Sequence, residues 1–95
     1  MEKKRVYSGL FIIDPDKEES LDDVVGKIKN IINENSGDIV EDRVIGKKRL
    51  SYPISKKTEG VYYEGTFNAL PSSIAKITRL CRINTDIMRS VINTK

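Results

Sequence analysis

Histidine and tryptophan are absent from this 95-residue chain, and cysteine occurs once, at Cys81. Without histidine the chain has no Ser-His-Asp or Cys-His catalytic group and no general base whose ordinary pKa lies near neutrality. A single cysteine also leaves out an internal disulfide and the usual zinc sites. We therefore expect no catalytic residue, no metal and no cofactor, and a reducing cytoplasm as the compartment.

Long apolar runs are also absent. The longest run covers residues 10–13, far below the roughly 18 to 20 residues that cross a bilayer. The basic first residues lack the apolar segment of a secretory signal. We expect a single domain over residues 1–95, and a chain of this length buries only a little over about 60% of its unfolded surface. Neither a membrane nor a small-molecule substrate is predicted as a partner.

Acidic residues are scarce in the second half of the chain. Residues 1–45 contain seven Lys/Arg and eleven Asp/Glu, a net charge of −4, whereas residues 46–95 contain ten and three, a net charge of +7. A basic half of this kind indicates an acidic partner, of which nucleic acid is the commonest. The alternative is that part of the charge serves only as a solubility surface.

Hydrophobic periodicity predicts the first two elements. β-branched and aromatic residues over 6–13 predict a strand with two apolar faces, which is typical of a central strand, and residues 14–16 form a turn after it. Apolar residues three and four apart over 21–32 predict a helix. Ser20 is expected to cap its start, and residues 35–37 are expected to end it with a left-handed residue.

An unusually long extended segment follows at residues 38–54, with Gly46 as the expected position of a bulge. At about 3.3 Å per residue it would measure roughly 50 Å, so part of it should project as an arm. A polar turn at 56–60, a strand at 61–69, a helix opened by Pro71 and a strand at 86–93 complete the chain. The order β-α-β-β-α-β predicts an α+β, ferredoxin-like fold, with four antiparallel strands and both helices on one face.

Three consecutive cations followed by an aromatic residue mark residues 46–55 as a candidate binding segment. Alternation along a strand separates two sets of side chains, Lys47 and Arg49 on one side and Lys48, Leu50, Tyr52 and Ile54 on the other. The first set suits phosphate groups, and the second suits an apolar and aromatic partner surface. The alternative is an edge strand that lysine and proline protect from aggregation. The placement of Leu50 and Tyr52 favours partner binding.

Arginine is concentrated near the end of the chain, at Arg79, Arg82 and Arg89. Arg79 and Arg82 are three residues apart, so they share a helix face and can donate bidentate hydrogen bonds to neighbouring phosphates. The alternative is that arginine at a helix C-terminus complements the helix dipole.

Aromatic residues on the two predicted central strands leave two other functions open. One is a free-standing module of the RNA-recognition type, which would stack single-stranded bases on Tyr62 or Tyr63, although core packing explains about half of these rings. The other is a ferredoxin-like oligomerising or regulatory domain that binds no RNA. The acidic residues 14–19 lack the glycine and glutamate of a calcium loop and are expected to form a solvated turn. Cys81 is expected in the core.

Residues 46–54 resemble the signature of protein number six of the bacterial small ribosomal subunit. That signature is a glycine, a variable residue, a basic and a polar residue, then Leu, Ala or Ser, Tyr, any residue and Ile, and every position is satisfied here. Residues 5–7 and 14–15 resemble the opening of the family, and residues 82–84 and 87–91 resemble its last strand. The resemblance covers nearly the whole chain.

The resemblance implies a structural, non-enzymatic protein of the cytoplasmic small ribosomal subunit. Its implied partners are the central domain of the small-subunit ribosomal RNA and protein number eighteen of the same subunit. The residues expected at the RNA are Lys4, Arg5, Arg79, Arg82 and Arg89. The residues expected at the protein partner are Lys47, Lys48, Arg49, Leu50, Tyr52 and Ile54. We expect the cations to converge on one continuous patch in the folded chain.

Overall fold

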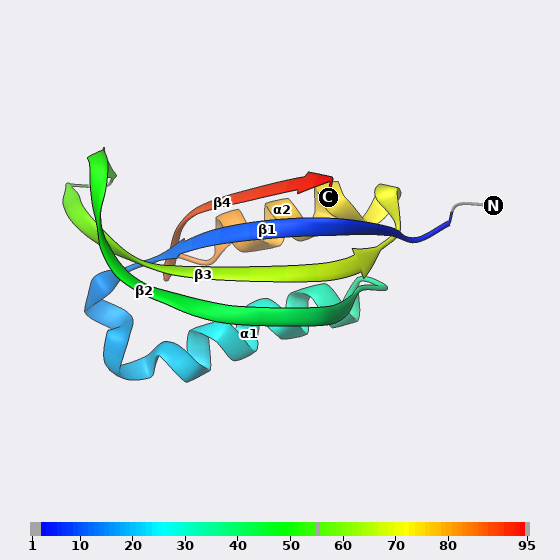
Figure 1. Cartoon of the computed structure of the whole chain (residues 1–95), viewed down its shortest axis with the longest axis horizontal. Coiled ribbons are helices and arrows are strands. Elements are labelled where there is room, and N and C mark those ends of the chain that lie inside the picture. The colour runs from blue at the N-terminus through cyan, green and yellow to red at the C-terminus, as the bar shows by residue number, and fades with distance from the viewer. Residues whose placement is uncertain (1–2, 55, 95) are drawn as a thin grey trace.

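The computed structural model describes residues 3–54 and 56–94 and shows an antiparallel sheet with two helices on one face (Figure 1). The strands are β1 (Arg5–Ile13), β2 (Asp38–Ile54), β3 (Lys57–Ala69) and β4 (Ile87–Thr94), in the order β2-β3-β1-β4 across the sheet. The helices are α1 (Leu21–Glu34), which follows the short 3-10 helix η1 (Pro15–Ser20), and α2 (Pro71–Ile83). This arrangement confirms the predicted ferredoxin-like α+β fold and the central position of β1.

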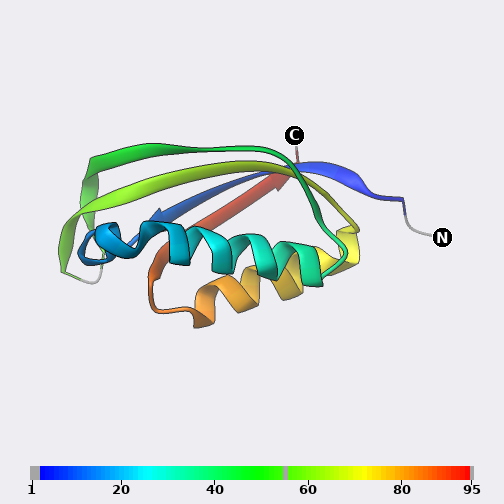
Figure 2. The ribbon, with the colours of Figure 1, turned by 90° about the horizontal axis from the view of Figure 1, so that it is seen from below.

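The core lies between the sheet and the two helices, which Figure 2 shows below the sheet. Alternate residues of β1 and β3 face the helices and are buried, and opposite rings on these neighbouring strands pack in pairs. The ring centroids lie 6.0 Å apart for Tyr7 and Phe67 and 5.9 Å apart for Phe11 and Tyr63. The helices contribute Val24, Ile28, Ile32, Ile77 and Cys81. Cys81 is therefore a core residue, as predicted.

The end of α1 follows the sequence closely. Ser36 adopts the left-handed conformation with φ of 67°, and the N–H of Gly37 donates to the carbonyl oxygen of Ile32 at 2.8 Å. This is a Schellman closure, in which the carbonyl of Ile32 also accepts the N–H of Asn35 at 3.2 Å. The predicted capping bond from the Ser20 side chain is absent, because η1 runs directly into α1 and the N–H of Leu21 donates to the carbonyl of Glu18 instead.

β2 and β3 form a long hairpin whose far end bends away from the sheet at the left of Figure 1. The register shifts at Gly46, which has a φ of 118°, so the predicted bulge is confirmed. A second shift leaves residues 50–53 without a partner on β3. We call residues 46–54 and 56–60 the arm.

The predicted turn at residues 56–60 is wrong in its extent. β3 begins at Lys57, because Glu59 and Gly60 pair with Arg49 and Lys48 across the hairpin. Pairing with β2 at Lys48, Arg49 and Ile54 therefore extends the strand through residues whose composition favours a turn. Of the described residues in this segment, Lys56 retains a turn conformation, with φ of 66°.

A buried hydroxyl group links the sheet to Asp42. Tyr63 is 1% exposed, and its hydroxyl group donates to Oδ2 of Asp42 at 2.7 Å, where Nζ of Lys29 from α1 lies 3.1 Å away. The hydrogen bond from Tyr63, followed by that from Lys29, lowers the pKa of Asp42 below its ordinary value of 3.8. Burial, together with the bond to Asp42, raises the pKa of Tyr63. The tyrosine therefore stays a donor, and the aspartate stays an acceptor, at neutral pH.

Tyr63→Phe is expected to lower the free energy of unfolding at pH 7 by about 1 to 2 kcal/mol, because it removes a hydrogen bond to a charged group. The pKa of Asp42 is depressed in the folded state, so this contribution is fully present above the unfolded value of 3.8 and is lost as the pH falls through the folded pKa. Urea unfolding of both proteins between pH 7 and pH 3 should show the difference shrink below that value. A constant difference over this range would contradict the assignment.

Candidate binding surface

Ion pairs within the described residues neutralise mostly the cations of the first half of the chain. The paired cations are Lys4, Lys17, Lys27, Lys29, Arg43 and Lys57. Between residues 3 and 94, leaving out 55, no carboxylate forms such a pair with Lys47, Lys48, Arg49, Arg79, Arg82 or Arg89. The uncompensated positive charge therefore includes the arm, the end of α2 and the start of β4.

Arg82 and Arg89 belong to different elements and line the same hollow. Arg82 lies in the last turn of α2 and Arg89 near the start of β4, and both are exposed. They line one hollow of about 340 Å³, which we call the arginine hollow, and its lining is Cys81, Arg82, Ile87, Met88, Arg89, Ser90 and Val91. Arg79 is exposed one turn earlier on α2. Two guanidinium groups beside one concavity can grip the same phosphodiester segment.

Lys4 and Arg5 lie at the other end of the sheet. Arg5 pairs with Ala69 at the start of β1, whereas Arg89 pairs with Ile12 seven residues along the same strand. At about 3.3 Å per residue this separates the two arginines by roughly 23 Å along β1. Nζ of Lys4 is also paired with Oδ2 of Asp38 at 2.8 Å. The expectation of one continuous patch is therefore wrong, because the antiparallel register places the two groups at opposite ends.

The arm presents its second set of side chains on the face of the sheet that the helices leave open. There Leu50, Tyr52 and Ile54 line a small concavity of about 100 Å³ together with Ile12, Ser51, Tyr62 and Arg89. Nζ of Lys48 lies 5.9 Å from the centroid of the Tyr62 ring on the same face. The predicted alternation is confirmed for this set, which we call the arm strip: Lys48, Leu50, Tyr52 and Ile54. Tyr52 is 56% exposed, so its ring is available to a partner.

Tyr52 and Arg89 are in direct contact. Nη1 of Arg89 donates a hydrogen bond to the hydroxyl oxygen of Tyr52, and the guanidinium carbon lies 5.8 Å from the centroid of the Tyr52 ring. The sequence gives no sign of this contact, since 37 residues separate the two positions. The bend of the arm is what brings them together.

Lys57 is a second residue that the sequence analysis missed. It holds the tip of the arm, where Lys57 pairs with Ile54, to η1 through a hydrogen bond to Asp16 and an ion pair with Asp14, whose Oδ1 lies 3.7 Å from Nζ. The hydrogen bond to Lys57 lowers the pKa of Asp16. The acidic segment 14–19 is therefore an exposed 3-10 helix, close to the predicted solvated turn, and it also anchors the arm.

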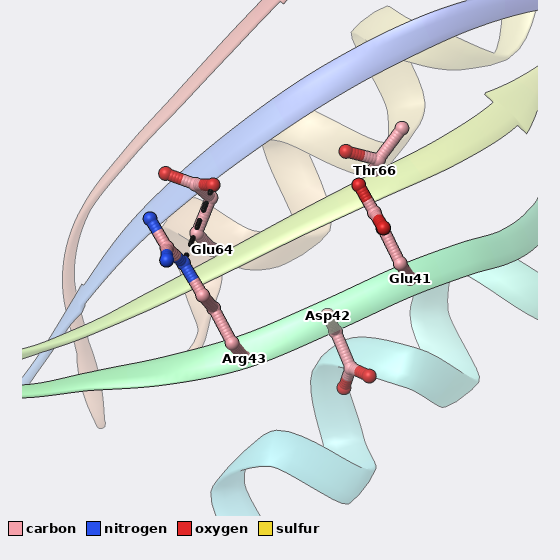
Figure 3. A pocket seen from close by; sticks show the side chains of 5 residues that line it. All are labelled: Glu41, Asp42, Arg43, Glu64 and Thr66. Carbon is pink, nitrogen blue, oxygen red and sulfur yellow. Dashed lines mark ion pairs between the residues drawn. The ribbon is translucent and has the colours of Figure 1, made fainter.

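A polar hollow lies over the outer strand β2 and its neighbour β3 (Figure 3). It is lined by Glu41, Asp42, Arg43, Glu64 and Thr66; Nε of Arg43 lies 3.8 Å from Oε1 of Glu64, and the Asp42 side chain points toward α1. Carboxylates in this position disfavour phosphate.

Stacking of bases on the central strands finds little support in the structure. Tyr63 is buried and hydrogen-bonded, so it presents no ring to a base, and that part of the RNA-recognition alternative is wrong. Lys48 lies over the ring of Tyr62. Because alternate residues of β3 face opposite sides, Tyr62 and Tyr63 cannot both belong to one stacking platform.

Among residues 3–54 and 56–94, no helix has the length and apolarity to cross a membrane, and no three His, Cys, Asp or Glu side chains gather as metal ligands. Burial raises the pKa of the Cys81 thiol to about 11, which disfavours the reactive thiolate.

A small ferredoxin-like domain with uncompensated arginines beside an exposed aromatic strip defines a basic binding protein. Residues 6–93 match the family model of ribosomal protein S6, and the chain belongs to that family. Members of the family are structural and non-enzymatic, so this chain is a structural protein of the small ribosomal subunit, and hence cytoplasmic.

Curated relatives cover almost the whole chain. Small ribosomal subunit protein bS6 of Caldanaerobacter subterraneus is 35% identical over 89 residues, which are 93% of this chain and 94% of the relative. The protein of the same name from Paenarthrobacter aurescens is 36% identical over 93% of this chain and 88% of its own length.

Solved structures of two other proteins have the same fold as this chain. The crystal structure of 30S ribosomal protein S6 from Thermotoga maritima superposes with a TM-score of 0.90 at 28% identity, covering 98% of this chain and 89% of that one. The C-terminal domain of the MgtC protein from Mycobacterium tuberculosis has a TM-score of 0.62 at 9% identity over 100% of this chain and 92% of that chain, so it shares the fold alone.

Proposed function

We propose that this chain binds the central domain of the small-subunit ribosomal RNA together with protein number eighteen of that subunit. The observation that carries the proposal is the meeting of Arg82 and Arg89 at the arginine hollow, beside the exposed Tyr52 of the arm strip. This juxtaposition supplies a surface for phosphate and a surface for protein side by side.

The RNA side of the proposal rests on phosphate neutralisation. Guanidinium groups donate in pairs to phosphate oxygens, and Arg82 and Arg89 have no competing carboxylate among the described residues. Arg79 extends this surface along α2, whereas Lys4 and Arg5 would form a second contact at the other end of the sheet. RNA that reached both groups would bridge roughly 23 Å along β1. The proposed role is to brace folded RNA at two points.

The protein side rests on the arm. Residues 50–53 lack a partner on β3, and the strip offers Tyr52 as an exposed aromatic anchor with Leu50 and Ile54 beside it. Exposed aromatic residues with apolar neighbours are the usual centre of a protein interface. Lys47 and Arg49 belong to the other set of the alternation, where they would reach RNA at the rim of the same interface. Protein number eighteen is proposed to pack on the arm strip.

An Arg82→Ala/Arg89→Ala double variant is expected to bind a central-domain RNA fragment about tenfold more weakly, in the presence of protein number eighteen, in gel-shift titrations. Binding should weaken with salt between about 50 and 200 mM, because counterions leave the RNA on binding. The slope of log affinity against log salt should fall by about one for each arginine removed.

A matched control removes two cations that already have a partner. Nζ of Lys17 and Nζ of Lys27 lie 3.8 and 3.6 Å from carboxylate oxygens of Asp86, so Lys17→Ala/Lys27→Ala makes the same change in net charge at an ion-paired place. This control variant should keep most of the RNA affinity and most of the slope of log affinity against log salt. Equal losses in the two double variants would mean that only net charge matters, and unchanged RNA binding by the arginine variant would contradict the proposed site.

A further inference from the structure

We propose that Tyr52 is a positioning residue for Arg89, and that through this pair the protein partner strengthens the binding of RNA. The inference rests on the proposed function, because it assumes RNA at the arginine hollow and a protein on the arm strip. It goes further because it proposes that one contact, between Tyr52 and Arg89, couples RNA binding at the arginine hollow to partner binding at the arm strip.

The contact depends on how the arm is shaped. β2 and β4 are the two outer strands, with β3 and β1 between them, so a flat sheet would hold them roughly 14 Å apart. The bulge at Gly46 and the unpaired residues 50–53 let the arm bend toward the β4 side of the sheet, as the left side of Figure 1 shows. Tyr52 then reaches Arg89 across the concavity lined by Ile12 and Tyr62.

Arg89 is held without being neutralised. Its guanidinium group has five N–H donors, of which Nη1 donates to the hydroxyl group of Tyr52, and the Tyr52 ring lies beside the group. No carboxylate of the described residues pairs with it, and its charged neighbour in the arginine hollow is Arg82. The other donors are therefore available to a phosphate while the side chain keeps one orientation.

An arginine that is already oriented loses less conformational freedom when it binds phosphate. Tyr52 is 56% exposed, so a partner can pack on its ring while the hydroxyl group stays bonded to Arg89. A partner that packs on the Tyr52 ring fixes the ring, and the hydrogen bond passes this restraint to Arg89. Because coupling between two binding events is reciprocal, RNA on Arg89 must strengthen partner binding by the same factor.

The test uses Tyr52→Phe, which removes the hydroxyl group and keeps the ring for the partner. Tyr52→Phe is expected to weaken binding of the central-domain RNA fragment about three- to tenfold, the range expected for the loss of one ordinary hydrogen bond, because the charge of Arg89 remains. In an Arg89→Ala background the same change should have no further effect. Tyr7→Phe is the matched control, since it removes a hydroxyl group from a tyrosine that packs in the core opposite Phe67, outside this concavity, and should leave RNA affinity unchanged.

A second readout separates positioning from a structural role. The factor by which protein number eighteen strengthens RNA binding should fall toward one in Tyr52→Phe, whereas the urea midpoint should stay unchanged. Additive losses for Tyr52→Phe and Arg89→Ala, or an unchanged coupling factor, would overturn this inference alone. RNA binding that is unaffected by Arg89→Ala would overturn the RNA site of the proposed function, and this inference with it.

Discussion

Phe11→Ala is expected to lower the free energy of unfolding by about 3 to 5 kcal/mol, as measured by urea unfolding followed by circular dichroism. Phe11 is fully buried in the middle of β1, and its ring lies 5.9 Å from that of Tyr63 on the neighbouring strand. Truncation removes apolar surface from the core and leaves a cavity between two strands that cannot close it easily.

The effect is large in relation to the whole domain. Natural domains have unfolding free energies of only about 5 to 15 kcal/mol, so this variant should be partly unfolded at 37 °C if the protein lies at the lower end. Val6→Ala is the matched control on the same strand, because Val6 is 41% exposed, and it should change stability by less than about 0.5 kcal/mol. A loss below 1 kcal/mol for Phe11→Ala would contradict the central role of this ring.

The sequence predicts the core well, because its apolar residues form two clear patterns, a continuous apolar strand and an apolar helix stripe. Residues 6–13 carry apolar side chains on both faces, and β1 proves to be a central strand with Phe11 and Ile13 fully buried. The stripe in residues 21–32 supplies the buried Val24, Ile28 and Ile32 of α1. Apolar residues three and four apart lie on one side of a helix but on both sides of a strand. Burying them together therefore specifies a helix.

The sequence predicts less well where β3 and α1 begin, because these boundaries depend on neighbouring segments. Lys57 to Gly60 have the composition of a turn, yet they are strand residues because β2 opposite them is extended and offers hydrogen-bonding partners. The capping bond expected from Ser20 failed for a related reason, since η1 already supplies the carbonyl group that the first N–H of α1 needs. The composition of a segment does not reveal that β2 lies opposite it or that η1 precedes it.

The sequence identifies the parts of the proposed binding surface but not their arrangement. The charge asymmetry and the motif around Tyr52 point to the arm and the terminal arginines. Register then decides that Arg89 lies far from Arg5, and the bend of the arm brings Tyr52 to Arg89. Register depends on every pair along two strands, and a bulge such as that at Gly46 changes it for the whole arm. The contact between Tyr52 and Arg89 is a consequence of these bends, which no single segment determines.

Gly37→Ala is expected to lower the free energy of unfolding by about 2 to 4 kcal/mol, the sum of overpacking and a weakened hydrogen bond. Gly37 is buried immediately after α1, where an added Cβ would clash with Cγ2 of Ile32 and lie 2.7 Å from the carbonyl oxygen of that residue. The same carbonyl accepts the N–H of Gly37 at 2.8 Å, so moving the chain away weakens the closure of the helix. Urea unfolding measures the loss.

Gly26→Ala makes the same chemical change inside α1, and it should raise the free energy of unfolding instead of lowering it. An added Cβ at Gly26 meets nothing within 4 Å, and alanine is a better helix former than glycine, so we expect stabilisation of about 0.5 to 1 kcal/mol. The pair of variants separates the space at each position from the general cost of replacing glycine. A loss in both variants would mean that α1 tolerates no added methyl group, whereas a gain in both would mean that the chain after Ile32 relaxes freely.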